Sequence, residues 1–392
     1  MKNLNAIELS QKLIQIPSYS GHNKPIINLI KDYLADLDFK CDILDFAGDG
    51  SYKVNNLHAV FNPNNYSQIL YFAGHTDIVN EGNKGSWRFP PFSATISEDK
   101  LYGRGASDMK CAIACFMIAV KEFLYQNKSP KFGIGFLITN DEEADGVNGT
   151  KKVLNWMRQN NHKISSCIVG EPTNPSKFGE MMKIGRRGSV SFSLKVIGKQ
   201  GHVAYPQIAL NPNTIMVNIL RILKDHKFDD GNKFFDATNL EVTAIESQNL
   251  GGNVIPNEVS ANFNVRFNDN HSGQDIVNLV KYVCDKSVSN LNDIEARYDL
   301  QFRISGESFL CQPKKIANLA KESIIKNCNI VPEFSTSGGT SDARFIKDYC
   351  SDMVELGLIN ETAHKIDECS KIEDVTSLKN VYLDILQNYS PA

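Results

Sequence analysis

The sequence predicts an α/β protein whose mainly parallel sheet is flanked by helices, with an inserted α+β open sandwich. Apolar strand-like runs alternate with helical patterns up to about residue 180, half-exposed alternating strands begin near residue 185, and helical patterns resume after about residue 300. Strands that alternate with helices favour a parallel sheet covered on both faces. At 392 residues, the chain also exceeds the size at which one hydrophobic core usually stops growing.

The larger domain begins with elements that alternate along the chain. We expect an amphipathic helix within residues 1–21, a buried strand at 69–74, a long buried helix at 111–126, and strands at 131–143 and 165–173 that run into loops. Parallel sheets carry functional residues in the loops beyond the carboxyl ends of their strands. We therefore expect residues 1–182 to form the first part of the domain that bears the site.

A strict alternation of polar and apolar residues marks the insert. Its strand-like segments at 188–199, 239–247 and 258–268 are interleaved with helical segments at about 211–225 and 273–289. The order strand, helix, strand, strand, helix predicts a small open sandwich that folds as a separate unit. We place this insert at residues 183–297. Residues 298–392 then complete the larger domain, with helices near 313–327 and 373–389.

Composition excludes several classes of protein. A net charge of -3 gives no reason to expect binding to nucleic acid or to an anionic membrane. We find neither a signal peptide nor a stretch approaching the roughly 18 apolar residues of a membrane helix. The nine cysteines include no CxxC pair, which fits reduced thiols and predicts a cytoplasmic protein.

His75 and Asp77 stand two positions apart at the end of an apolar run. Residues i and i+2 of an extended strand point to the same side, so both side chains face one place. Taken alone, such a pair is more often a solvated turn than a metal or catalytic site. The rest of the chain changes this balance.

Imidazole and carboxylate groups recur at equivalent places, in the loops that follow strands or precede a helix. Besides His75, they are Asp108 in "GRGASDMK", Glu142 and Glu143 in "TNDEE", Glu171 in "VGEPT" and His364 in "NETAHKIDE". Each alone has an ordinary structural explanation, such as a helix cap for Asp108. Together they match a hydrolytic zinc, cobalt or manganese site, in which a bridging carboxylate holds two ions about 3.5–4 Å apart.

Five motifs carry a family resemblance. "GHTDIV", "GRGASDMK", "DEEADGVNGT", "GEPT" and "HKIDE" resemble those of the co-catalytic dizinc aminoacylase and carboxypeptidase family of metallohydrolases. The resemblance spans nearly the whole chain. It implies a zinc exopeptidase-like catalytic domain and an insert that serves as a dimerisation and lid domain.

The resemblance also implies a role for each metal ligand. Asp108 bridges two Zn²⁺ ions in each subunit, with Co²⁺ able to substitute at one site. His75 and Glu171 complete one metal site, and Glu143 and His364 complete the other.

Two further roles in the larger domain follow from the same resemblance. Asp77 orients His75 by accepting a ring N–H. Glu142 is the general base, which takes a proton from water and passes it to the leaving amine. The Asp108–Met109 peptide bond is expected to be cis.

In the insert, the resemblance assigns the remaining roles. His202, in "GKQGHVAYP", polarises the substrate carbonyl in the partner subunit of a homodimer. Without the resemblance, a strand-end histidine packed on Tyr205 would be the better interpretation. The residues expected to bind the substrate are Arg186, Asn253, Arg266, Gly339, Thr340 and Ser341. A fork-shaped guanidinium suits a substrate with several carboxylates.

The segments "KIGRRGSVSFSL", "GKQGHVAYP", "NVIPNE" and "SGGTSDARF" make the resemblance most specific. They resemble family members that hydrolyse N-succinyl-LL-2,6-diaminopimelate to succinate and LL-2,6-diaminopimelate in lysine and diaminopimelate biosynthesis. An acetylornithine deacetylase or related aminoacylase is the alternative enzyme. The alternative of another class is a metal-free binding relative, which the intact set of ligands disfavours.

Overall fold

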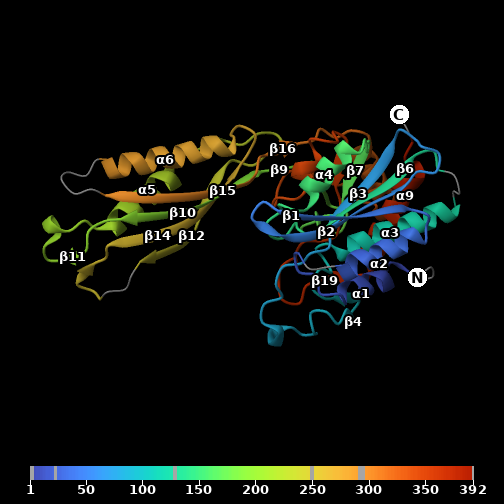
Figure 1. Cartoon of the computed structure of the whole chain (residues 1–392), viewed down its shortest axis with the longest axis horizontal. Helices are drawn as coiled ribbons and strands as arrows, with labels where there is room; N and C mark the ends of the chain where they lie inside the picture. The colour runs from blue at the N-terminus through green and yellow to red at the C-terminus, as the bar shows by residue number, and fades with distance from the viewer. Residues whose placement is uncertain (1–3, 22–23, 127–129, 248–250, 290–295, 391–392) are drawn as a thin grey trace. The chain divides into compact units, whose positions relative to one another are not determined.

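The structure is a computed structural model that describes residues 4–21, 24–126, 130–247, 251–289 and 296–390. The chain divides into two compact units (Figure 1). Unit 1 comprises residues 1–184, 311–335 and 341–392, and unit 2 comprises residues 185–310 and 336–340. Each unit has its own hydrophobic core.

A large mixed sheet forms the centre of unit 1. Its strands, in spatial order, are β1 (Lys40–Gly48), β2 (Ser51–Phe61), β6 (Gly133–Thr139), β3 (Ile69–His75), β7 (Ser166–Val169), β18 (Met353–Glu355), β8 (Met181–Lys183) and β17 (Glu333–Ser335). The central strands β6, β3, β7 and β18 run parallel to one another. The predicted mainly parallel sheet is therefore confirmed, with an antiparallel hairpin of β1 and β2 at one edge.

Helices cover this sheet. They are α1 (Ala6–Ile14), α2 (Lys24–Ala35), α3 (Lys110–Gln126), α4 (Thr150–Gln159), α7 (Lys315–Cys328), the short α8 (Ala343–Ile346) and α9 (Ile372–Asn388), and a small sheet of β19 (Cys369–Lys371), β5 (Lys100–Tyr102) and β4 (Thr95–Ser97) lies beside them. The helices predicted at 111–126, 313–327 and 373–389 are confirmed by α3, α7 and α9.

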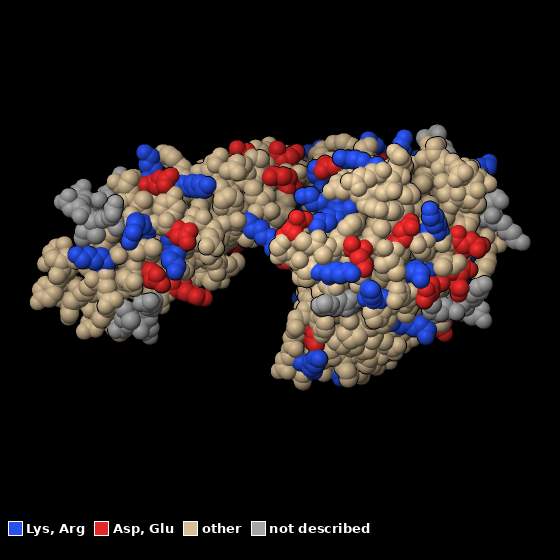
Figure 2. Space-filling model, viewed as in Figure 1, with Lys and Arg blue, Asp and Glu red and all other residues tan. Residues whose placement is uncertain are grey.

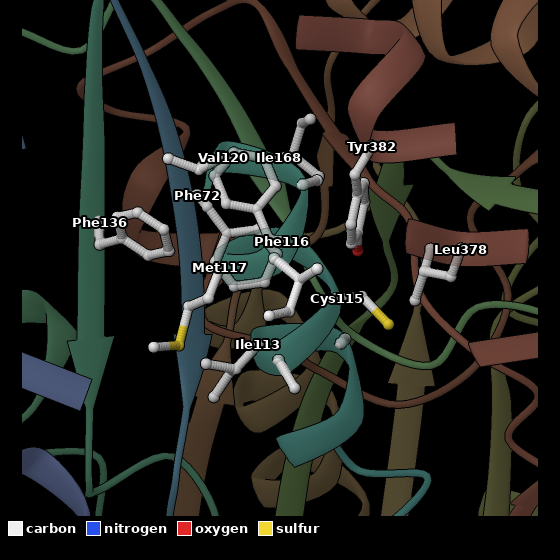
Figure 3. Close-up of a cluster of buried hydrophobic side chains, with 14 of the residues drawn as sticks. Phe72, Ile113, Cys115, Phe116, Met117, Val120, Phe136, Ile168, Leu378 and Tyr382 are labelled. Atoms are coloured by element: carbon white, nitrogen blue, oxygen red, sulfur yellow. The ribbon is translucent and has the colours of Figure 1, made fainter. Parts of the chain in front are cut away.

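Aromatic packing joins the central strands to α3 and α9. Phe72 of β3 stacks on Phe116 of α3 with ring centroids 4.6 Å apart, and Tyr382 of α9 meets both rings edge to face (Figure 3). Every side chain of α3 from Lys110 to Lys121 is buried. A helix that is apolar on all sides belongs in the core of a large domain. This core fixes the strands whose ends carry the candidate ligands.

Unit 2 is an open-faced sandwich. Its sheet has the order β12 (Asn239–Ser247), β14 (Glu258–Phe267), β10 (Gly188–Ile197) and β15 (Arg297–Gly306), and all neighbours are antiparallel. The helices α5 (Pro212–Asp225) and α6 (Gly273–Ser289) share a core with one face, on which Phe192 and Phe263 stack 4.9 Å apart. Polar side chains such as Asn264, which donates to Ser191, occupy the other face. This alternation is the pattern expected of a half-buried sheet.

Short elements complete unit 2. They are the paired strands β9 (Gly185–Arg186) and β16 (Phe309–Leu310), the paired strands β11 (Gly201–His202) and β13 (Val254–Ile255), and a 3₁₀ turn at Pro206–Ile208. A second 3₁₀ turn, at Lys84–Ser86, lies in unit 1.

The predicted end of the insert at residue 297 differs from the structure. That residue is the first of β15, which pairs along β10 as the fourth strand of the sheet, and unit 2 continues to Leu310. β15 is an edge strand with many exposed residues. The segment "YDLQFRI" does alternate between apolar and polar residues, as a half-buried strand does, so the predicted boundary was placed one strand too early.

The surface agrees with the small net charge. On the face shown in Figure 2, lysine and arginine side chains are interspersed with aspartate and glutamate. Within the described part of the chain, no helix combines the length and the apolarity needed to cross a membrane.

Candidate metal centre

The candidate ligands gather at one edge of the parallel sheet in unit 1. His75 is the last residue of β3, Glu143 lies in the loop after β6, and Glu171 lies just after β7. His364 lies in the loop that follows β18, and Asp108 lies two residues before the start of α3. Neighbouring parallel strands end at the same edge of a sheet, so their following loops meet there. The structure thus brings all five predicted ligands into one cluster.

Asp108 lies in the middle of this cluster. Its Oδ1 is 3.0 Å from Nε2 of His75, and its Oδ2 is 3.3 Å from Nε2 of His364. Nε2 of His75 is also 3.7 Å from Oε1 of Glu171, and Nε2 of His364 is 2.9 Å from Oε1 of Glu143. One imidazole and one further carboxylate therefore lie on each side of Asp108. The Asp108–Met109 peptide bond is cis, as expected.

The electrostatics of the cluster favour cations. Hydrogen bonds with Asp108 and Glu143 raise the pKa of His364 to about 10. Burial alone would lower the pKa of His75, but hydrogen bonds with Asp108 and Asp77 raise it well above its usual value. Both imidazoles thus lie in a pocket with excess negative charge, where divalent ions can replace the protons. The set of imidazole and carboxylate donors, without thiolate, fits zinc, cobalt or manganese.

Asp77 supports two parts of the cluster. Nδ1 of His75 lies 3.0 Å from the backbone oxygen of Asp77 and 3.6 Å from its Oδ1, so the closer contact is with the carbonyl. The carboxylate of Asp77 accepts the backbone N–H groups of Glu142 at 3.0 Å and Glu143 at 2.9 Å, and the hydroxyl of Ser20 at 2.8 Å. Asp77 therefore holds the Glu142–Glu143 loop as well as His75, a role that the sequence did not indicate.

Glu142 lies beside the ligands. Burial, followed by the negative charges of Glu171 and Asp342, raises the pKa of Glu142 well above its usual value. These three residues and His75 line one small pocket. A raised pKa makes a carboxylate a stronger base, which suits the predicted general base.

Asp342 was missed by the sequence interpretation, although it lies in the quoted segment "SGGTSDARF". Its side chain is buried, and neither carboxylate oxygen makes a hydrogen bond among the described residues. Burial raises the pKa of Asp342. Only its position next to Ser341 could have drawn attention to it.

Asp141 is a second missed residue, and it shapes the loop that carries Glu142. Its buried carboxylate accepts the Tyr52 hydroxyl at 2.6 Å and three backbone N–H groups of the same loop. These N–H groups belong to Gly146, Val147 and Asn148. An aspartate a few residues before a glycine is a common turn signal, and "DEEADG" contains it.

Glu368 is the third missed residue. It is 1% exposed, and its carboxylate accepts N–H groups from the loop that precedes Asp108. The segment "HKIDE" ends with this glutamate, but the sequence interpretation used only His364 from it.

His202 and Asn253 lie in unit 2, and the structure brings them together. His202 ends β11, and the N–H of the next residue, Val203, donates to the carbonyl of Asn253 at 3.1 Å. The His202 ring is exposed, with its centroid 5.7 Å from that of Tyr205. Nδ1 of His202 accepts the N–H of Ala204 at 3.0 Å. The neutral ring must then carry its proton on Nε2, which is free to act as a donor.

The two predicted arginines also belong to unit 2. Arg186 is buried on β9, and Arg266 is half-buried on β14. Nη1 of Arg266 is buried and has no hydrogen-bond partner among the described residues. Burial, followed by the charge of Arg187, lowers the pKa of Arg266. Arg187 itself donates to Oδ1 of Asn239 at 2.9 Å.

The predicted glycine-rich segment spans the boundary between the units. Gly339 and Thr340 belong to unit 2, whereas Ser341 belongs to unit 1. A Cβ atom added at Gly338 would lie 2.9 Å from Nη1 of Arg186, so this segment lies against Arg186. The hydroxyl of Ser341 is buried without a hydrogen-bond partner in the described part of the chain.

Comparisons with known proteins place this geometry in context. The model of Peptidase family M20/M25/M40 matches residues 71–388. A curated relative from Pelagibacter ubique (strain HTCC1062), named succinyl-diaminopimelate desuccinylase, is 43% identical over 393 residues, which cover 99% of this chain and 100% of the relative. The family resemblance expected from the motifs is confirmed.

Solved structures share the fold at lower sequence identity. The metallo-carboxypeptidase Sso-CP2 of Sulfolobus solfataricus superimposes with a TM-score of 0.79 at 18% identity, covering 98% of this chain and 99% of that one. The YXEP protein of Bacillus subtilis, a dinuclear metal binding peptidase, has a TM-score of 0.66 at 14% identity and covers 97% and 96%. These likenesses confirm the predicted fold class.

Proposed function

The chain belongs to Peptidase family M20/M25/M40, and from this premise we propose that it hydrolyses N-succinyl-LL-2,6-diaminopimelate to succinate and LL-2,6-diaminopimelate. This activity is the one in the name of its full-length relative, and it belongs to lysine and diaminopimelate biosynthesis. The single observation on which the proposed chemistry rests is the position of Asp108. Its two carboxylate oxygens face two histidines, and each histidine is paired with a further carboxylate.

Two metal sites would share Asp108. His75 and Glu171 would hold one ion, and Glu143 and His364 would hold the other, which we take to be Zn²⁺ with Co²⁺ as a substitute at one site. When bound, such ions lower the pKa of a water molecule and polarise an amide carbonyl. The dinuclear metal binding of the YXEP protein, which shares the fold, supports this assignment.

Glu142 would act as the general base. It would accept the proton of the attacking water and transfer it to the nitrogen of diaminopimelate as the amide bond breaks. Hydrogen bonds from its own N–H and that of Glu143 to Asp77 hold the loop, so the base and a metal ligand move little relative to each other. Such preorganisation reduces the entropy that is lost in the transition state.

His202 would stabilise the oxyanion that develops on the carbonyl. Its N–H at Nε2 is available because Nδ1 accepts the Ala204 N–H. We propose that His202 acts in the neighbouring subunit of a homodimer. Large apolar side chains exposed on unit 2 support an interface there: Val203, Tyr205, Ile208, Val217 and Ile245, which are 47–63% exposed. Such exposure is typical of association surfaces.

Arginine and amide groups would select the substrate. Arg186 and Arg266 would bind carboxylates through paired N–H donors, and the buried free Nη1 of Arg266 is the kind of donor that a carboxylate satisfies. Asn253, Gly339, Thr340 and Ser341 would supply the remaining hydrogen bonds. A succinyl group adds one carboxylate that an acetyl group lacks.

The test compares substrates and metals. Purified protein is stripped of metal, reloaded with zinc, and assayed with N-succinyl-LL-2,6-diaminopimelate and with N-acetylornithine. We expect zinc-dependent release of succinate and at least about 100-fold lower kcat/KM for acetylornithine, because the buried Nη1 of Arg266 would lack the carboxylate that the succinyl group supplies. Preference for acetylornithine would identify a deacetylase instead. Activity without metal would contradict the assignment of the ligands.

A further inference from the structure

The carboxylate of Glu368 accepts several hydrogen bonds from the loop that ends at Asp108. Its Oε1 accepts the backbone N–H groups of Ser107 at 2.8 Å and Asp108 at 3.0 Å, and its Oε2 accepts the N–H of Gly105 at 3.0 Å. Gly105 has a φ of +85°, a left-handed conformation that glycine adopts without strain. A single buried carboxylate thereby binds three donors of one short loop.

Arg104 balances the charge of Glu368. Its Nη1 donates to Oε2 of Glu368 at 2.7 Å, both side chains are almost fully buried, and the guanidinium lies 5.2 Å from the centroid of the Trp87 ring. Nη2 of Arg104 also donates to the carbonyl of Asn80 at 3.4 Å. A buried carboxylate remains ionised only when it is paired and hydrogen-bonded, and Arg104 together with the loop meets both conditions.

We propose that Glu368, held by Arg104, is a positioning residue that sets Asp108 between the two metal sites. An aspartate side chain has few torsions, so the position of its backbone largely decides where its two oxygens lie. Glu368 binds that backbone at the residue itself and at the one before it. The inference rests on the proposed function, because it assigns Glu368 a purpose only if Asp108 bridges two ions.

The ordinary alternative is that Glu368 and Arg104 form a buried ion pair that only stabilises unit 1. Both explanations predict that loss of Glu368 destabilises the fold. They differ in what happens to the metal. Groups that orient a ligand typically change metal affinity about 10–100-fold when removed, whereas a purely structural ion pair leaves the affinity of the folded protein unchanged.

Three variants separate these explanations. Glu368→Gln keeps the shape but turns an NH₂ group toward the N–H donors. Glu368→Asp keeps the charge next to Arg104 but is one methylene too short for the loop, and it serves if the glutamine variant does not fold. The double variant Arg104→Met with Glu368→Gln removes both charges, so the unpaired arginine no longer destabilises the fold.

The measurements use the full chain. Zinc affinity is determined by chelator competition, the geometry of the sites from the visible absorption spectrum of the Co²⁺-loaded protein, and stability from thermal unfolding. Asp384→Asn is the matched control, because Asp384 is another buried carboxylate of unit 1, paired with Lys326 between α9 and α7. It should lower the melting temperature and leave zinc affinity and the cobalt spectrum unchanged.

We expect each Glu368 variant to bind zinc about 10–100-fold more weakly and to show an altered cobalt spectrum. The double variant should show the same two changes even though its stability is recovered. Wild-type zinc affinity and spectrum in a folded Glu368 variant would reduce Glu368 to a structural ion pair and overturn the inference. If the wild-type chain itself bound fewer than two ions, the proposed function would fail first. The two failures are therefore distinguishable.

Discussion

The two sheets of the protein place functional residues in different ways. In unit 1, neighbouring parallel strands end at one edge, where the last residue of β3 and the loops after β6, β7 and β18 contribute four of the five candidate ligands. In unit 2, antiparallel neighbours end at opposite edges, and the candidate residues lie on the separate short strands β9 and β11, on β14 and in the turn before β13. A parallel sheet thus concentrates loops at one place, whereas the antiparallel sheet distributes them.

The two units also differ in the roles proposed for their residues, which are metal binding and proton transfer in unit 1 and substrate recognition in unit 2. The cluster in unit 1 contains every residue proposed to hold metal or to accept the proton of water. Unit 2 contains His202 and the arginines proposed to bind carboxylates. Changes in unit 1 should therefore affect metal binding or the chemical step, and changes in unit 2 should affect turnover or substrate choice while the metal stays bound.

Glu142→Gln should give the largest loss. The amide still forms hydrogen bonds but cannot accept a proton, so kcat should fall by about 10²–10⁴ while both metal ions remain bound. Steady-state kinetics and the metal content of the same sample provide the test. Glu98→Gln, which changes an exposed glutamate of unit 1 paired with Arg88, should be unaffected. Near-normal turnover of the metal-loaded Glu142 variant would remove this residue from the role of base.

His202→Ala should have the next largest effect, from the other unit. Loss of one oxyanion donor typically lowers turnover by about 10²–10³, and zinc affinity should not change. His226→Ala alters another exposed histidine of unit 2 and is the matched control. If the His202→Ala variant also bound zinc more weakly, His202 would belong with the metal ligands. Metal binding would then not be confined to unit 1.

Mixed dimers test whether His202 acts across an interface. A His202→Ala chain and a Glu142→Gln chain are each inactive, but a heterodimer reunites an intact base with an intact donor in one site. About half of wild-type activity should return, because twofold symmetry gives one functional site of two. If verified heterodimers remain as inactive as the parents, His202 acts within its own chain or not at all.

Asp77→Asn should have an intermediate effect within unit 1. The amide cannot accept from Glu142, Glu143 and Ser20 through both of its ends, so the loop that carries the base and a ligand loosens. Metal affinity or turnover should fall about 10–100-fold. Chelator competition and kinetics measure the two effects. A variant that loses stability but keeps wild-type affinity and turnover would assign Asp77 a purely structural role.

The sequence predicted the ligands better than their supports, for a physical reason. His75, Glu143 and Glu171 follow apolar runs that are recognisable as strands, and strand polarity then places them together. Asp77, Asp141 and Glu368 support the site by accepting backbone N–H groups from other segments or from later in a loop, and no periodicity indicates such partners. Asp342, which lies 3.7 Å from Nη2 of Arg344, was missed because a buried carboxylate that holds no turn or helix cap has no local signal.

In the insert, too, the sequence predicted some features of the structure and not others. The predicted ranges of three strands agree with the interior strands β10 and β14 and with the edge strand β12. The other edge strand, β15, was assigned to the other domain, although its apolar and polar residues also alternate. No pattern in the chain distinguishes Arg186 from Arg187 or selects His202, so these residues were predicted only from the resemblance to a family.

Acid should destabilise the two units in different pH ranges, which is a smaller effect than the losses of turnover predicted above. Burial, followed by the proximity of His162, lowers the pKa of His58 in β2 to about 4, although Asp42 opposes the shift. In the unfolded chain the pKa of histidine is about 6.5, so below this pH the unfolded state binds more protons. The contribution of neutral His58 to the stability is therefore fully present above pH 6.5 and decreases as the pH falls toward 4.

A partly buried carboxylate of unit 2, Asp229, behaves differently in this range. Burial alone would raise the pKa of Asp229, but hydrogen bonds from Thr238, Gly231 and Asn268 lower it to about 2. A depressed carboxyl pKa contributes stability above the unfolded value of about 3.9, and that stability is lost only as the pH falls from there toward 2. Between pH 6.5 and 4, protonation should thus weaken unit 1 through His58 and leave the Asp229 contribution of unit 2 intact.

Thermal unfolding of the metal-loaded protein at several pH values tests this difference. His58→Gln keeps a partner for the Tyr71 hydroxyl, which lies 3.1 Å from Nε2 of His58, but it has no titrating group. The melting temperature of the variant should fall less steeply between pH 6.5 and 4 than that of the wild type, since each unit of pKa shift corresponds to about 1.4 kcal/mol. Asp229→Asn should differ from the wild type by a constant amount in this window. Equal slopes for the His58 variant and the wild type would show that His58 gains no proton on unfolding, and hence that its pKa in the folded protein is ordinary.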